Sequence, residues 1–167
     1  MHSYYLTNLR KKIGNDYLLL PSVTALILNA NNELLLVKHH DREVWVAPGG
    51  MVEPDEYPID TVVREVLEET GLCVIPNGIL GVYGGPEFRV TYKNGDETGY
   101  VMTVYFAKVI AGILKHDGEE TLDASYFPLD KIQGLSVGRW LPTVLYDLDH
   151  YLKAKKVFQL RGIDSYP

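Results

Sequence analysis

The sequence predicts an α/β protein with a mixed β-sheet and helices before, between and after the strands. Short β-prone segments are separated by turn residues, and segments with helical periodicity interrupt their series. The chain of 167 residues, with 46% hydrophobic and 23% charged residues, is also long enough to bury one core. No repeat or linker divides it, so a single folded domain is expected.

The domain boundaries follow from these patterns. We expect residues 1–20 to form an N-terminal helical extension, residues 21–155 the main domain and residues 156–167 a C-terminal tail. Within the extension, residues 3–13 have the pattern of a short amphipathic helix, and Gly14 is a typical helix stop.

The predicted strands are apolar or aromatic runs bounded by Gly, Pro, Asn and Asp. In chain order they are residues 22–28, 33–39, 44–46, 72–75, 79–83, 88–92, 100–110 and 125–127. The Asn94-Gly95 pair is a strong hairpin signal between the strands at 88–92 and 100–110. A last helix is predicted at about residues 137–154.

The segment 58–70 has the clearest helical pattern. Its apolar residues recur at i, i+3, i+4 and i+7, the spacing of a buried helix face. These residues are Ile59, Val62, Val63 and Val66. Pro58 suits the first helical turn, where its missing N–H costs nothing, and Gly71 suits the C-cap.

Three carboxylates lie on another side of this helix. Glu65, Glu68 and Glu69 share a helical repeat, and such a cluster of oxygen ligands suits Mg2+. The alternative is a solvated acidic face. Charges placed for solubility usually alternate in sign, whereas Glu65 and Glu69 repel each other and Arg64 is the nearest cation. The spacing therefore favours the metal site and leaves the solvated face open.

The residues around this helix resemble the Nudix box. Every specified position is filled, by Gly50, Glu56, Arg64-Glu65-Val66, Glu68-Glu69 and Gly71-Leu72. The resemblance extends to roughly residues 20–150 and implies a Nudix-type α/β/α sandwich. It also implies a hydrolase that cleaves the phosphoanhydride of a nucleoside diphosphate linked to another group.

The resemblance carries roles over to individual residues. Glu65, Glu68 and Glu69 would be ligands of Mg2+ or Mn2+, together with the carbonyl of Gly50. Glu68 and Glu69 would thereby take part in catalysis, with Arg64 orienting a box glutamate or touching phosphate. A salt bridge that only shapes the loop is the alternative for Arg64.

A general base is expected outside the box, in the acidic segment that precedes the strand at 125–127. The spacing of Glu120, Asp123 and Tyr126 resembles a later acidic motif of the family, and Glu120 is the first candidate. The alternative is an ordinary acidic loop.

The substrate contacts are less clearly indicated. Tyr83 belongs to a group of aromatic residues that could stack on a base, and Arg42 and Arg89 are candidates for phosphate contact. Core packing explains most of these aromatic residues equally well. His39 and His40 are adjacent near the end of a predicted strand, a position where solvated side chains are expected.

The predicted function is a metal-dependent pyrophosphohydrolase acting on a nucleotide sugar such as ADP-ribose or on a nucleoside triphosphate. Alternatives are a nucleotide-sanitising (d)NTP pyrophosphatase, a non-catalytic nucleotide sensor and an isoprenoid isomerase. The isomerase would need a cysteine–glutamate pair, for which Cys73 is poorly placed.

Composition and charge limit the classes of partner that this protein is expected to have. The net charge of −6 and the lack of a long basic tract argue against nucleic-acid binding. No apolar run approaches the roughly 20 residues that span a membrane, and one cysteine suits a reducing, cytoplasmic setting. A homodimer through the N-terminal segment is compatible with the sequence, which does not decide it.

Overall fold

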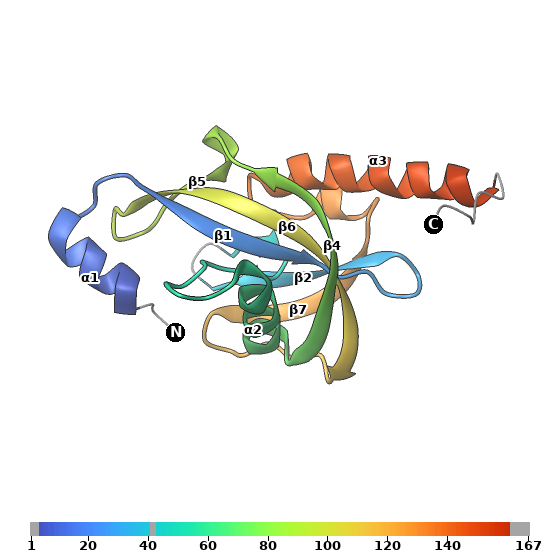
Figure 1. Ribbon diagram of the computed structural model, residues 1–167, viewed down its shortest axis with the longest axis horizontal. Helices are drawn as coiled ribbons and strands as arrows, with labels where there is room; N and C mark the ends of the chain where they lie inside the picture. Colours follow the sequence, from blue (N-terminus) through green and yellow to red (C-terminus); the bar gives the residue numbers. More distant parts are fainter. Residues whose placement is uncertain (1–3, 41–42, 161–167) are drawn as a thin grey trace.

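The structure, a computed structural model, describes residues 4–40 and 43–160, with side chains up to residue 154 (Figure 1). The elements follow the chain in the order α1 (Tyr4–Ile13), β1 (Leu18–Leu26), β2 (Glu33–His39), β3 (Trp45–Val46), α2 (Pro58–Thr70), β4 (Leu72–Tyr83), η1 (Pro86–Phe88), β5 (Arg89–Thr91), β6 (Glu97–Gly112), β7 (Thr121–Pro128), η2 (Ile132–Gly134) and α3 (Leu141–Leu160).

The described strands form two sheets. In the larger one, β6 pairs in parallel with β1 and antiparallel with β4 and β5. This sheet is mixed, as predicted. The smaller sheet is antiparallel in the order β3-β2-β7. In Figure 1, α2 and α3 lie on opposite sides of the strands. These layers confirm the predicted α/β/α sandwich.

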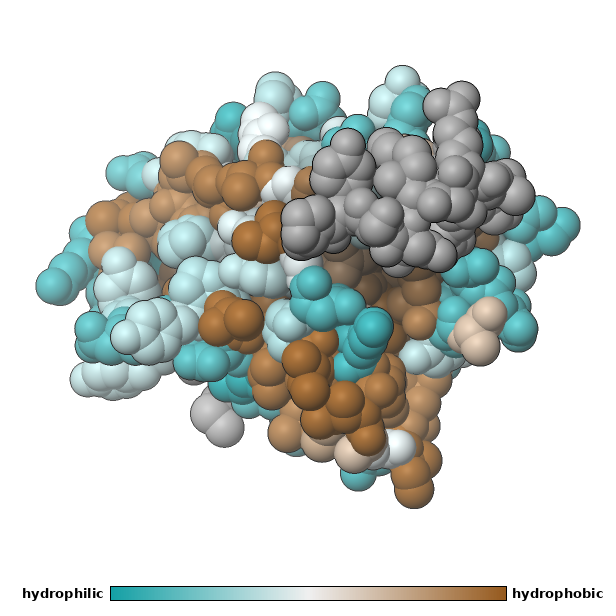
Figure 2. Space-filling view, turned by 45° about the vertical axis from the view of Figure 1, so that its right-hand side comes forward, coloured by the Kyte–Doolittle hydropathy of each residue, from teal (hydrophilic) through white to brown (hydrophobic). Residues whose placement is uncertain are grey.

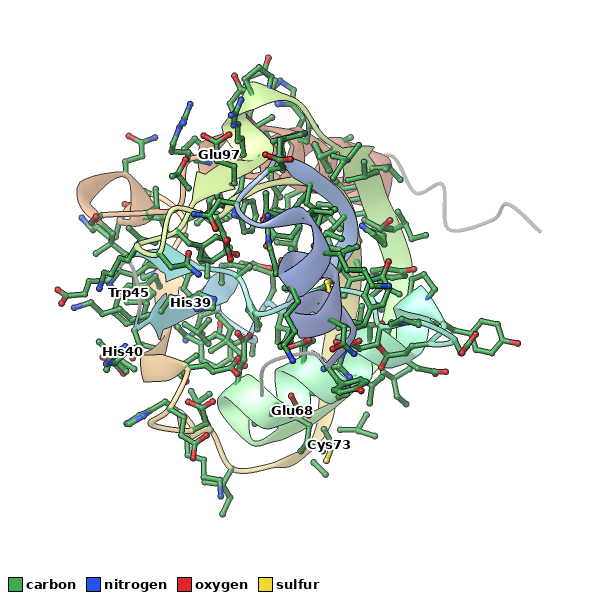
Figure 3. All side chains as sticks on the ribbon, turned by 90° about the vertical axis from the view of Figure 1, so that its left-hand side faces the viewer. His39, His40, Trp45, Glu68, Cys73 and Glu97 are labelled. Carbon is green, nitrogen blue, oxygen red and sulfur yellow. The ribbon has the colours of Figure 1, made fainter. Side chains whose placement is uncertain are left out.

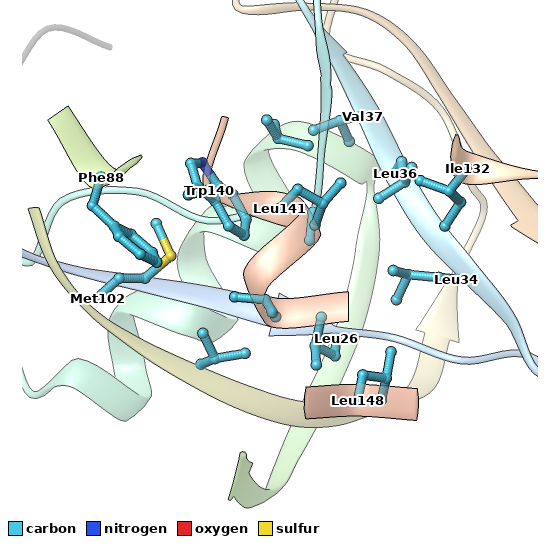
Figure 4. Close-up of a cluster of buried hydrophobic side chains, with 14 residues drawn as sticks. Leu26, Leu34, Leu36, Val37, Phe88, Met102, Ile132, Trp140, Leu141 and Leu148 are labelled. Carbon is cyan, nitrogen blue, oxygen red and sulfur yellow. The ribbon is translucent and has the colours of Figure 1, made fainter. Parts of the chain in front are cut away.

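The alternation of side chains along β2 divides the core into two clusters. Leu34 and Leu36 belong to one cluster and Leu35 to the other, because successive residues of a strand point to opposite faces. The cluster of Leu34 and Leu36 is completed by α3 through Leu141, Val144 and Leu148 (Figure 4). The cluster of Leu35 is completed by α2 through Val62 and Val66. Both helices are therefore held by burial of one apolar stripe.

Helix α2 has the predicted bounds but not the whole predicted buried face. Gly71 ends it in the left-handed conformation, with φ of 68°. Val62 and Val66 are buried, whereas Ile59 is 47% exposed. The fully buried stripe instead continues from Val66 to Glu69. Ile59 lies in the first turn of the helix. One of the three predicted ligands therefore lies on the buried side.

Several boundaries differ from the prediction because pairing with distant strands decides them. Strand β1 begins at Leu18, four residues early, since Leu18 pairs with Thr98 of β6. The two segments predicted at 72–75 and 79–83 form one strand, β4, which absorbs the intervening turn residues as irregularities of its pairing.

The C-terminal helix also differs. It starts at Leu141 rather than 137 and continues to Leu160, past its predicted end at 154.

No helix in the described residues is long and apolar enough to cross a membrane. Hydrophobic side chains are nevertheless gathered on one face of the molecule (Figure 2). Those exposed on β4 and β6 are Ile75, Ile79, Val82, Val101, Val109 and Ile110.

Candidate active site

A cavity of about 530 Å3 lies between α2 and the larger sheet. One wall is acidic and comes from α2 and the loops before α2 and β7. Its carboxylates are Glu53, Glu65, Glu68, Glu69, Glu119 and Glu120. Another wall is apolar and aromatic, and its residues are Leu6, Phe88, Val90, Tyr92, Tyr100, Met102 and Trp140. The structure thus brings four of the predicted site carboxylates to one cavity, with Arg64 and Gly50 beside them.

The loop before α2 is fixed along β1. The N–H of Val23 donates to the carbonyl of Gly50 at 2.9 Å, and the N–H of Ala25 donates to the carbonyl of Pro48 at 2.8 Å. Gly49 has φ of +155°, and a Cβ on it would lie 2.2 Å from the carbonyl oxygen of Val23. Only glycine allows this approach.

At the next position, Gly50, the crowding comes from a side chain rather than from backbone. A Cβ on Gly50 would lie 2.3 Å from the Glu65 carboxylate. The backbone of the loop and the carboxylates of α2 are therefore in direct contact.

Glu69 is the most deeply buried carboxylate of the site, with 2% of its surface exposed. Its Oε2 accepts the N–H of Gly49 at 3.0 Å, and its Oε1 lies 3.6 Å from Nε2 of His39. Burial raises the pKa of Glu69 well above its ordinary value, the charge of Glu65 adds to the rise, and the N–H of Gly49 opposes it. Ionised Glu69 is therefore costly without a nearby cation.

Arg64 is the guanidinium that organises the box. Its Nε and Nη2 donate to the two oxygens of Glu56 at 2.8 and 3.0 Å, and its Nη1 donates to Glu65 at 2.8 Å. Glu68 lies 3.6 Å from Nη1. The hydrogen bond from Arg64 lowers the pKa of Glu56 to about 2. Burial raises the pKa of Glu65, although Arg64 opposes the rise. Arg64 thus orients Glu65 while its charge is shared with Glu56.

Glu120 stands in a loop that is organised by Asp117. Oδ1 of Asp117 accepts the backbone N–H groups of Glu119, Glu120 and Thr121 at 2.9–3.1 Å, and the hydroxyl of Thr121 at 2.9 Å. The N–H of His40 donates to the carbonyl of Glu120 at 2.9 Å. The loop is therefore tied to the end of β2, and Glu120 lines the cavity beside Glu65 and Glu69.

Comparison with known proteins identifies the arrangement. A family model described as the NUDIX domain matches residues 18–147. The chain belongs to the Nudix family. The family match begins after α1, so the N-terminal helix is an addition to the part that the family shares.

Two relatives of this Nudix chain are named for different substrates. A putative 8-oxo-dGTP diphosphatase of Bacillus subtilis (strain 168) is 36% identical over 96 residues, covering 58% of this chain and 58% of the relative. An ADP-ribose pyrophosphatase of Methanocaldococcus jannaschii is 34% identical over 114 residues, covering 66% of this chain and 63% of the relative. The matched part thus spans less than two thirds of either relative.

A solved structure agrees with the fold. The MutT protein of Methanosarcina mazei Go1 is 28% identical and superposes with a TM-score of 0.69, covering 83% of this chain and 98% of that structure. This likeness confirms the α/β fold class that the sequence predicted.

The donors of the Nudix box fit a hard divalent cation. Burial raises the pKa of both Glu65 and Glu69, and the charge of Glu65 adds to the rise at Glu69. A cation between the two carboxylates would offset this cost of ionisation. In the described part of the chain, no three His, Cys, Asp or Glu side chains already surround one point. Mg2+ does not require such a cage, because it keeps waters and takes phosphate oxygens of the substrate. The carbonyl oxygen of Gly50 accepts a hydrogen bond from the N–H of Val23 with one lone pair. Its second lone pair could bind a cation.

Two of the three predicted substrate contacts have partners away from this cavity. The hydroxyl of Tyr83 donates to Asp147 of α3 at 2.8 Å, and the ring stacks on Phe88. Arg89 pairs with Glu97 and lies over the ring of Tyr17 at 4.9 Å. Neither Tyr83 nor Arg89 lines the cavity, because each has a structural partner elsewhere. Arg42 lies outside the described residues.

Other residues at the site were missed or misjudged. Trp140, Tyr92 and Leu6 line the cavity, although they belong to segments far from the box in the sequence. His39 was expected to be solvated, but its Nε2 lies 3.6 Å from a carboxylate oxygen of Glu69. Asp117 could have been found as the capping residue in Asp117-Gly118, a turn signal before a strand.

Proposed function

We propose that this Nudix protein hydrolyses the phosphoanhydride of a nucleoside diphosphate linked to another group, with Mg2+ or Mn2+. One observation carries the proposal: a single cavity has the box carboxylates on one wall and aromatic side chains on another. The acidic wall suits a cation and a diphosphate, and the aromatic wall suits a nucleobase. The matched relatives are named for cleavage of this class of compound.

The proposed ligands are Glu65, Glu68, Glu69 and the carbonyl of Gly50. A bound divalent ion supplies neutralisation of phosphoryl oxygens and a lower pKa for a coordinated water. The chain does the rest. Arg64 holds the Glu65 carboxylate toward Gly50, and the N–H of Gly49 holds Glu69 at 3.0 Å. Preorganised oxygens need no rearrangement when the substrate arrives.

Glu120 is the proposed general base. It lines the same cavity as the box carboxylates, on a loop that Asp117 and His40 fix by backbone hydrogen bonds. In this role its carboxylate accepts the proton of the water that attacks phosphorus.

Two substrate classes are proposed, because the relatives are named for both. One is ADP-ribose or a similar nucleotide sugar, and the other is a damaged nucleoside triphosphate such as 8-oxo-dGTP. The isomerase alternative is not favoured by the structure, since Cys73 lies on β4 and does not line the cavity. The sensor alternative predicts binding without turnover.

The test is hydrolysis of a small panel with Mg2+ or Mn2+: ADP-ribose, a UDP-sugar, dGTP and 8-oxo-dGTP. The readout is the nucleoside monophosphate formed from each compound, separated by chromatography. Turnover of at least one compound is expected. A protein that binds these compounds but releases no product would be a sensor, and the proposed activity would be rejected.

The same assay tests Glu120. The Glu120→Gln variant is expected to bind the cleaved compound as the native protein does and to lose about 10^2- to 10^4-fold in kcat. Asp130→Asn is the control, because its carboxylate is 75% exposed and does not line the cavity. Unchanged turnover in Glu120→Gln would remove Glu120 from the mechanism.

A further inference from the structure

Helix α1 contributes to the cavity although it lies outside the family match. The match begins at residue 18, whereas Leu6 of α1 lines the cavity together with the aromatic wall. Seen from the side that faces the viewer in Figure 3, α1 crosses in front of the sheets between Glu97 and Glu68. The helix therefore covers part of the face on which the cavity lies.

Polar bonds from one side chain hold α1 in this place. Arg10 donates to the carbonyl of Glu97 at 2.9 Å, to the hydroxyl of Thr98 at 2.8 Å and to the carbonyl of Asp16 at 2.7 Å. It also lies 3.5 Å from the carboxylate of Asp96. No side chain of α1 is fully buried. The helix is thus attached to the start of β6 and adds little to the core.

The contact surface of α1 toward the cavity is aliphatic. The side chain of Leu6 has no charge and no hydrogen-bonding group, so this side chain cannot hold a phosphate. It shares the cavity with Tyr92 and Tyr100, whose hydroxyls lie 2.6 Å apart, and with Trp140. Apolar and aromatic surfaces of this kind suit the flat face of a nucleobase.

We propose that α1 is a specificity element of this chain, in which Leu6 contacts the nucleobase of the substrate while the acidic wall takes the diphosphate. This rests on the proposed function only for the class of ligand. Leu6 is thereby a specificity-determining residue, and a nucleotide gains affinity from α1 that a diphosphate without a base does not gain.

The experiment measures binding rather than turnover. The full chain with Mg2+ is titrated calorimetrically with α,β-methylene-ADP and with methylenediphosphonate, which has the same bridged diphosphate and no base. Leu6→Ala is expected to raise the Kd for α,β-methylene-ADP about tenfold, since it removes three apolar carbons from the contact, and to leave that for methylenediphosphonate unchanged. Leu9→Ala, on the same helix but not lining the cavity, is expected to change neither.

Each other outcome overturns the inference. Equal weakening of both ligands by Leu6→Ala would mean a general disturbance, and no weakening would mean that Leu6 does not touch the base. A native protein that does not bind α,β-methylene-ADP would also overturn it. If Leu6→Ala does not fold, Leu6→Gln replaces it, with the same expected selectivity. If Leu6→Ala shows this selectivity but the native protein cleaves none of the compounds in the panel, only the proposed hydrolysis is rejected.

Discussion

At the scale of residues, the box glutamates of one segment have opposite electrostatic environments. Arg64 lowers the pKa of Glu56 to about 2, whereas burial raises that of Glu69 well above its ordinary value. Glu56 is therefore a structural anion with its own cation. Glu69 is a carboxylate whose cost of ionisation the N–H of Gly49 only partly offsets. This difference separates the carboxylate that shapes the loop from the one that suits a metal.

The effect of Glu69→Gln on stability is expected to depend on Mg2+. The variant should be at least as stable as the native protein without Mg2+ and less stable than the native protein with Mg2+. A carboxyl with a raised pKa in the folded state loses stability as the pH rises above its unfolded value of 4.5, so at pH 7.5 in EDTA the amide should be neutral or stabilising. With Mg2+, the native protein should gain melting temperature and the variant should not.

Thermal unfolding in EDTA and in Mg2+ checks this expectation. The control is Asp130→Asn, whose carboxylate is 75% exposed. Equal stabilisation of native protein and Glu69→Gln by Mg2+ would contradict the assignment of Glu69 as a ligand.

Glu56→Gln is expected to destabilise the fold at neutral pH by about 1–3 kcal/mol, because it removes a charged partner of Arg64. The pKa of Glu56 is lowered from 4.5 to about 2, so its contribution is complete above pH 4.5 and is lost as the pH falls toward 2. The difference between native protein and variant should shrink over that window. Urea unfolding at several pH values measures it, with the exposed Glu87→Gln as the control. A difference that stays constant from pH 7 to pH 3 would show that the ion pair does not stabilise the fold.

At the scale of elements, the loop before β7 is organised by a single oxygen. Oδ1 of Asp117 accepts four hydrogen bonds from the loop, and the hydroxyl of Thr121 also lies 3.3 Å from the carbonyl of Glu69 at the end of α2. Donors from Thr121, Glu119 and Glu120 outweigh the effect of burial and lower the pKa of Asp117. The position of Glu120 therefore depends on a residue that does not line the cavity.

Asp117→Ala is expected to lower the free energy of unfolding by about 1–3 kcal/mol, because several loop N–H groups lose their acceptor. It should also lower kcat more than it raises KM if Glu120 is the base. Asp117→Asn keeps the Oδ1 acceptor and should restore most of the rate. Asp123→Ala is the control, because it removes an acceptor of hydrogen bonds from Ala124 and Ser125 and none from this loop. A rate that falls equally in Asp117→Ala and Asp117→Asn would contradict the positioning role.

At the scale of the whole molecule, the site depends on segments joined by β1 and β6. The parallel register of Leu18–Leu26 with Thr98–Phe106 places β1 beside the aromatic residues of β6. On its other edge β1 receives the loop that carries Gly49 and Gly50. The acidic and aromatic walls of the cavity are thus set at a fixed separation by one strand.

Gly49→Ala is expected to destabilise the protein by about 3 kcal/mol or more and to weaken Mg2+ binding, since the added Cβ would lie 2.2 Å from the backbone of β1. Gly134→Ala is the matched control, because nothing lies within 4 Å of its Cβ position. Thermal unfolding and Mg2+ titration of both variants check the expectation. Equal stability of the two variants would mean that the loop can move away from β1 without cost.

The sequence alone determined the bounds of the box helix and the face that its carboxylates share. Local periodicity, Pro58 and Gly71 are sufficient to set the bounds of α2, because helix caps act within a few residues. The spacing of Glu65, Glu68 and Glu69 predicted a shared acidic surface for the same reason. These features depend only on neighbours along the chain, so they can be predicted from one short segment of the sequence.

Only the tertiary structure decided which side chains are buried and which partners they meet. It exposed Ile59, buried Glu69, paired Tyr83 with Asp147 of α3, and brought Leu6 and Trp140 to one cavity. Such contacts join residues far apart in the chain through strand pairing and helix packing. No local pattern encodes them, because the energy of a long-range contact depends on where both partners are placed by the rest of the fold.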